Sequence, residues 1–110
     1  MKHMGNYEIL SHVEMPECSI RIIGMKESEQ VALHHHEKST QIYTVLEQEV
    51  EVQVAGRTMR LRPYETVRIE MGVHHSVRPL EGPALVLSLS IPPLDRDDVH
   101  VAEEEAPSQT

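Results

Sequence analysis

Three consecutive histidines lie within a segment that has the residue pattern of β-strands. The segment VALHHHEKSTQIYTVLE, residues 31–47, contains His34, His35 and His36. Side chains at positions i and i+2 of a strand point to the same face, so His34 and His36 share one face and His35 points to the other. Imidazole is neutral enough near pH 7 to offer a ring nitrogen to a metal ion. The run is internal and short, unlike a purification tag, which leaves a metal site and ordinary surface polar residues as the alternatives.

A second histidine pair strengthens the metal interpretation. The segment EMGVHHSVRP, residues 70–79, places His74 and His75 shortly after Gly72, at the start of another strand-like run. Adjacent strand residues point to opposite faces, so only one of this pair can point inward. Two histidine clusters on separate strands of one barrel favour a shared metal site.

Alternation of apolar and polar residues predicts the elements that must position these side chains. In residues 49–63, EVEVQVAGRTMRLRP, valines alternate with Glu and Gln, and the pattern resumes after Ala55-Gly56. Two strands around such a short turn form a hairpin. Similar runs, separated by Pro, Gly or polar residues, predict an all-β sandwich or barrel; they are residues 7–14, 18–27, 31–36, 41–47, 66–71, 74–79 and 84–92.

Composition limits the class of protein. The 110 residues suit one domain, and the core must be aliphatic because Trp and Phe are absent. A formal charge of −8 argues against nucleic-acid binding, which needs clustered Lys and Arg. Cys18 is the single cysteine, which excludes an internal disulfide and fits a reducing compartment. No run has the length of a signal peptide or a membrane span, so we expect a cytoplasmic protein with no membrane partner.

The composition changes at Pro92. Residues 92–110 begin with two prolines and contain six acidic residues, which is typical of a solvated tail unless a second subunit holds it. We therefore expect a single barrel domain over residues 1–91 and an acidic C-terminal tail over residues 92–110.

Residues 28–91 resemble a small single-domain cupin. That family is a double-stranded β-helix, or jelly-roll barrel, with a metal held by two motifs, which would lie within residues 28–79 here. The first motif contains His-x-His, matched by His34 and His36, and the second contains a Gly and a His, matched by Gly72 and His75. The resemblance implies that these three histidines are inner ligands. The first motif usually has Gly, Glu and Gly where this chain has Ser28, Gln41 and Gln48. The second usually has Gly, Pro and Asn where it has Tyr64, Glu70 and Pro79.

The residue at position 41 affects the chemistry that the resemblance implies. Gln41 offers a neutral amide oxygen where the family has Glu, so a divalent site would keep its full charge. Affinity should then be lower, a bound water more acidic and a ferric state harder to reach. These effects favour Lewis-acid chemistry with Zn, Mn, Fe(II) or Ni over redox cycling. Gln41 either coordinates the ion itself or only forms a hydrogen bond nearby.

The resemblance leaves several functions open, because the same fold hosts many reactions. The first is a metalloenzyme acting on a small carbonyl, acid, sugar or phenolic compound, as a dioxygenase, isomerase or lyase. The alternatives are a non-catalytic small-molecule or metal-dependent sensor and a storage or structural protein. Tyr43 and Met25 are candidates for the pocket wall, an inward Arg could hold a carboxylate, and His74, Tyr43 and Glu70 are the candidate general bases. We expect a homodimer in which the strand around residues 7–13 crosses to the partner.

Overall fold

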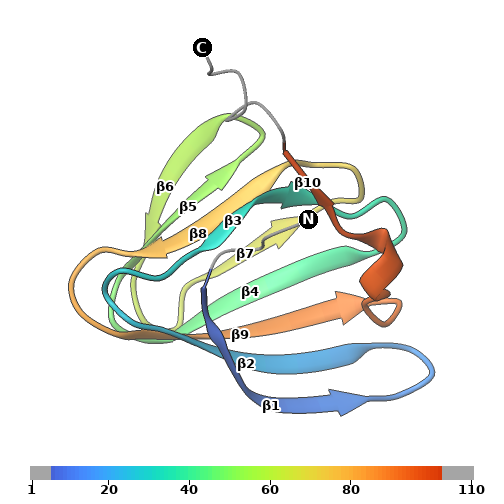
Figure 1. Ribbon diagram of the computed structural model, residues 1–110, viewed down its shortest axis with the longest axis horizontal. Helices are drawn as coiled ribbons and strands as arrows, with labels where there is room; N and C mark the ends of the chain where they lie inside the picture. Colours follow the sequence, from blue (N-terminus) through green and yellow to red (C-terminus); the bar gives the residue numbers. More distant parts are fainter. Residues whose placement is uncertain (1–5, 103–110) are drawn as a thin grey trace.

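The computed structural model describes residues 6–102, which form two facing five-stranded antiparallel sheets (Figure 1). The strand orders are β1-β2-β9-β4-β7 and β10-β3-β8-β5-β6. This arrangement confirms the predicted all-β fold of the jelly-roll type. Within residues 6–102, no helix is long and apolar enough to cross a membrane. The elements are β1 (Glu8–Glu14), β2 (Ser19–Met25), β3 (Val31–His35), β4 (Thr40–Glu47), β5 (Val50–Val54), β6 (Arg57–Leu61), β7 (Thr66–Ile69), β8 (His75–Pro79), β9 (Ala84–Ile91), the short 3-10 helix η1 (Arg96–Asp98) and β10 (His100–Val101).

The predicted hairpin is present. β5 pairs with β6 from Val50↔Leu61 to Val54↔Arg57. The turn between them has positive φ at both Ala55 (53°) and Gly56 (81°), the combination that a two-residue hairpin turn requires. The other strands that the alternation predicted are also present, with ends that differ by a few residues.

The space between the sheets changes from apolar to polar along the strands. On β9 the inward residues are Ala84 and Val86, followed by Ser88 and Ser90. The paired strand β4 repeats this order, because its Val45 lies opposite Val86 and its Gln41 opposite Ser90. The aliphatic part forms the core. The polar part is the end at which the histidines are buried.

The outer face of the sheet β1-β2-β9-β4-β7 is also apolar. Ile22 of β2, Leu87 of β9 and Thr44 of β4 are direct cross-strand neighbours, and the adjacent row contains Ile20, Leu89 and Ile42. These Ile and Leu side chains are only partly buried. β1 pairs with β2 of its own chain and adds the exposed Leu10 and Val13, each 52% exposed.

The segment after Pro92 packs against the barrel as far as Ala102, whereas the sequence suggested a solvated segment. β10 pairs with β3, and the Ala102 amide donates to the Leu33 carbonyl oxygen at 3.0 Å. Asp98 is only 3% exposed, and its carboxylate accepts hydrogen bonds from the amides of Glu37 and Lys38 at 3.0 and 2.7 Å. The acidic residues of this segment therefore include one with a structural role. The rest of the predicted tail lies outside the described residues, and the domain boundary at residue 91 stays a prediction.

Two positions where the cupin motifs have glycine adopt a backbone conformation that favours glycine. Gln48 has φ 66° and Tyr64 has φ 74°, both in the left-handed region. A side chain with a Cβ is strained there by about 1–2 kcal/mol relative to glycine. The motif glycines are thus explained by backbone geometry, and this chain tolerates the strain.

We expect Gln48→Gly to raise the free energy of unfolding by about 0.5–1 kcal/mol, because relief of backbone strain outweighs the entropy that glycine adds to the unfolded chain. Thermal unfolding followed by circular dichroism measures the change. The matched control is Gln53→Gly, on an exposed strand position, which should destabilise the protein. Equal destabilisation by both variants would show that the φ of Gln48 carries no strain.

Candidate metal centre

Three histidine rings meet at the polar end of the barrel interior. His34 of β3 lies directly opposite His75 of β8, and His36 follows β3 by one residue. The three side chains are 1–3% exposed. The ring centroid of His34 lies 4.1 Å from that of His75 and 4.7 Å from that of His36. One ring nitrogen from each histidine can be chosen so that all three lie within 4.8 Å of one another, and the cluster could hold a metal ion.

Backbone carbonyl oxygens orient the three rings. Nδ1 of His34 donates to the Ala32 oxygen at 2.7 Å, and Nδ1 of His75 donates to the Val73 oxygen at 3.0 Å. Nδ1 of His36 donates to the Asp98 oxygen at 2.8 Å. In a neutral ring this leaves the lone pair on Nε2. Nε2 of His36 is buried without a hydrogen-bond partner among the described residues, as expected for an atom that binds a ligand.

Burial keeps these imidazoles neutral at physiological pH. Desolvation, followed by repulsion from His75, lowers the pKa of His34 to about 2. Desolvation likewise lowers the pKa of His75 to about 4, and it lowers the pKa of His36. Because a metal binds the neutral form, no proton has to be displaced near pH 7.

Gln41 points its amide oxygen at the histidines. Its Oε1 lies 2.9 Å from Nε2 of His75 and accepts a hydrogen bond from the Tyr43 hydroxyl at 3.2 Å. Its Nε2 donates to the Ser90 hydroxyl at 3.0 Å, which fixes the orientation of the amide. Nε2 of a neutral His75 and Oε1 of Gln41 then face each other as two electron-pair donors. A shared cation would make this contact favourable, so the donor set fits a divalent ion.

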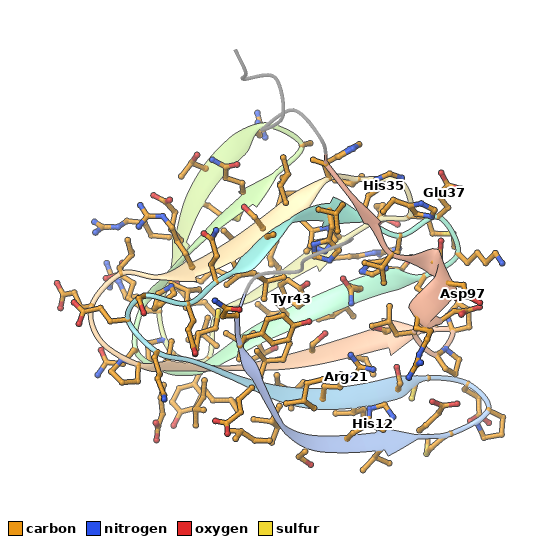
Figure 2. All side chains as sticks on the ribbon, in the orientation of Figure 1. His12, Arg21, His35, Glu37, Tyr43 and Asp97 are labelled. Carbon is orange, nitrogen blue, oxygen red and sulfur yellow. The ribbon has the colours of Figure 1, made fainter. Side chains whose placement is uncertain are left out.

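A cavity of about 260 Å³ opens beside His34, His36 and Gln41. Its wall includes Arg21, Arg96, Tyr7 and Tyr43, and no carboxylate among the described residues lines it. Figure 2 shows Tyr43 between the two sheets and Arg21 at β2, where it lies opposite the buried Ser88 of β9. The cavity is therefore cationic in a protein whose formal charge is −8.

The other candidate wall residues and bases from the sequence lie in different parts of the structure. Tyr43 lines the cavity, and burial raises its pKa. Met25 belongs to the aliphatic core. His74 is exposed, and Glu70 is exposed in an ion pair with Arg68 at 2.7 Å. Of the three candidate bases, only Tyr43 is close to the three buried histidines, and its hydroxyl stays protonated.

Sequence reasoning missed the residues that the C-terminal segment contributes. Leu94, Arg96 and Val99 line the cavity, and the Asp98 oxygen orients His36. The only signal was the short apolar alternation at residues 99–101, within an acidic segment. Ser90 accepts the hydrogen bond that orients Gln41. In the sequence it appeared only as one member of the alternation in ALVLSLSI.

Comparison with known proteins agrees with this architecture. Residues 21–90 match the cupin domain family. No protein of curated function matches the chain. Several solved structures share the fold. KdgF from Halomonas sp. is 21% identical with a TM-score of 0.75, over 84% of this chain and 90% of that chain. A double-stranded β-helix protein from Klebsiella pneumoniae is 17% identical with a TM-score of 0.69, over 84% and 80%. A recombinant oxalate oxidase in complex with glycolate is 19% identical with a TM-score of 0.64, over 67% and 41%.

Proposed function

Because the chain belongs to the cupin domain family, we propose that it is a small metalloenzyme that holds one divalent transition metal through His34, His36, His75 and Gln41. The observation that carries the proposal is the orientation of the three rings, each fixed through Nδ1 by a backbone oxygen. Such contacts to the remote nitrogen are typical of histidines that ligate metals. Zn, Mn, Fe(II) and Ni all suit imidazole and amide-oxygen donors.

We assign the cavity to a small organic anion, with a carboxylate as the best-fitting group. Arg21 and Arg96 line it without a carboxylate partner among residues 6–102, and a guanidinium can bind a carboxylate through two hydrogen bonds. Gln41 supports the same assignment, because a neutral ligand set leaves charge on the ion for an anionic substrate to balance. The glycolate held by the similar oxalate oxidase has this chemistry.

The chain's own residues would orient the substrate and donate hydrogen bonds. When bound, the ion would supply Lewis-acid polarisation of a carbonyl or hydroxyl oxygen. Tyr43 keeps its proton and holds Gln41, while Arg21 fixes the carboxylate. The lack of a carboxylate base among the described lining residues favours the second candidate, a sensor that binds such an anion without turnover.

The experiment that tests the anion site is titration of the Zn-loaded protein with glycolate by calorimetry. We expect saturable binding that Arg21→Gln weakens by about tenfold or more, since loss of a charged hydrogen-bonding partner costs roughly 1.5–3 kcal/mol. Neutral glycolamide is the control ligand and should bind much more weakly. Arg68→Gln, which removes an exposed arginine outside the cavity, is the control variant. Equal binding by wild type and Arg21→Gln would exclude the proposed anion site.

Turnover separates the two candidate functions. Small hydroxy acids and keto acids are incubated with the metal-loaded protein and followed by NMR. Consumption that His34→Ala abolishes would establish an enzyme. Saturable binding without consumption would assign the chain to the sensor class.

We infer a homodimer through the outer face of the sheet β1-β2-β9-β4-β7, because exposed apolar patches of this kind mark interfaces. A second copy is the best occupant, since a two-fold dimer brings the same patch of both copies together and would cover the Ile and Leu rows of each. We expect Leu87→Glu, at its centre, to give a monomer in light scattering at micromolar concentration. Thr58→Glu, on the exposed side of β6, is the control and should stay dimeric. A monomeric wild type would refute the dimer.

A further inference from the structure

A second histidine cluster lies on the opposite side of β3 from the buried one. The ring centroid of His35 lies 4.5 Å from that of His74 and 4.8 Å from that of His100, with which it stacks at 22°. Figure 2 shows His35 beside Glu37 and away from Tyr43 and Arg21. These side chains point out of the barrel and take no part in the cavity.

The fold brings this cluster together from two segments that are distant in sequence. His35 of β3 and His100 of β10 are direct cross-strand neighbours. Glu37 follows two residues after His35, and its carboxylate lies 3.4 Å from Nε2 of His35. One potential ligand atom from each of the three residues can be chosen so that all lie within 4.8 Å of one another.

The described residues satisfy the polar groups of the cluster only in part, although Nε2 of His100 lies 3.1 Å from the Asp98 carboxylate. Nδ1 of His35 is buried with no hydrogen-bond partner among them. The contact between His35 and Glu37 is long for a hydrogen bond. Two imidazoles and a carboxylate in this arrangement suit borderline dications, and His74 offers a further imidazole at the edge.

We propose that His35, Glu37 and His100 form a second, external site for a dication such as Zn²⁺, Ni²⁺ or Cu²⁺, which fastens β10 to β3. The segment before β10 supplies Leu94, Arg96 and Val99 to the cavity wall. It also supplies the Asp98 oxygen that orients His36. An ion at the external site therefore stabilises the wall of the cavity from outside. The site does not depend on metal binding by the buried cluster.

The first test counts Zn²⁺ by equilibrium dialysis and mass spectrometry. We expect two equivalents in the wild type, one in His34→Ala, one in His100→Ala and none in the double variant. His34 is chosen because its ring makes no hydrogen bond to the C-terminal segment. The matched control is His12→Ala, because His12 and Glu14 have the same spacing as His35 and Glu37, but His12 lies opposite Arg21 and no second histidine among residues 6–102 joins them. This control should keep both equivalents.

The second test follows hydrogen exchange of the Ala102 amide, which is bonded to Leu33. In His34→Ala, Zn²⁺ at ten times its dissociation constant should slow exchange by about tenfold, because binding favours the closed segment. In the double variant His34→Ala/His100→Ala it should have no effect, because neither site is then complete.

The outcomes distinguish the external site from the buried one. Two equivalents in both His100→Ala and His35→Ala would overturn the external site. A single wild-type equivalent that His34→Ala removes and His100→Ala keeps would overturn it and leave the proposed function intact. A single wild-type equivalent that His100→Ala removes and His34→Ala keeps would support the external site and overturn metal binding at His34.

Discussion

His36→Ala is expected to lose the tightly bound metal ion that survives dialysis. Disturbing an outer partner of a metal-bound histidine already lowers affinity by about 10–100-fold, so removing a ligand should cost roughly 100-fold or more. His36 is the most informative position because its Nε2 is buried and unpartnered among the described residues. Metal content by mass spectrometry, after incubation with Fe(II), Mn, Ni or Zn, provides the measurement.

The same measurement on Gln41 variants tests the role of the amide. Gln41→Glu should raise affinity by on the order of tenfold or more, because a full negative charge replaces a dipole beside the ion. Gln41→Ala should lower affinity if Oε1 is a ligand and leave it unchanged if the amide only positions His75. His12→Ala is the control and should keep the ion. Metal retained in full by His36→Ala, or no metal in the wild type, would refute the buried site.

Metal-free protein is expected to lose stability steeply as the pH falls from about 6.5 to 5. In this range the unfolded chain takes up protons on His34, His36 and His75. In the folded chain burial lowers the pKa of all three rings, to about 2 for His34 and to about 4 for His75. The folded state thus binds fewer protons, and the free energy of unfolding decreases with falling pH. Each such group contributes up to about 1.4 kcal/mol per pH unit, or roughly 3 kcal/mol per pH unit for His34 and His75 together, and His36 adds to this in the same direction.

Urea unfolding in the presence of a chelator, at several pH values, measures this dependence. His75→Gln removes one titrating ring and should flatten the slope by roughly 1.4 kcal/mol per pH unit at most. Its control, Thr58→Gln, changes an exposed residue of β6 that does not titrate and should leave the slope unchanged. The same slope for all three proteins would show that the buried rings do not control the acid sensitivity.

The barrel and the histidine set could be predicted because their signals are local. Alternation located the strands, and the spacing of two in His34-x-His36 placed both rings on one face. The outward direction of His35 followed from the same rule. The resemblance selected His75 over His74. In the structure His75 is buried opposite His34 and His74 is exposed, and metal binding by this set stays a prediction.

The cavity wall could not be predicted because it depends on contacts that alternation does not encode. Arg21 looks like any surface arginine until β2 is placed beside β9, where it lies opposite Ser88 on the inner face. β9 is also an exception to the expectation that the apolar residues of a strand face the interior. Its leucines face outward and its serines face inward, because the interior at that end is polar. Asp98 lay in a segment whose composition predicted solvent exposure.

The C-terminal segment that covers the cavity has a consequence for how such a protein can diversify. Residues 92–102 contribute wall residues and the oxygen that orients His36, yet none of them belongs to the aliphatic core. Substitutions in this segment can therefore reshape the cavity without disturbing the packing on which the barrel depends. Proteins that share these histidines are expected to have diverged in ligand preference chiefly through this covering segment.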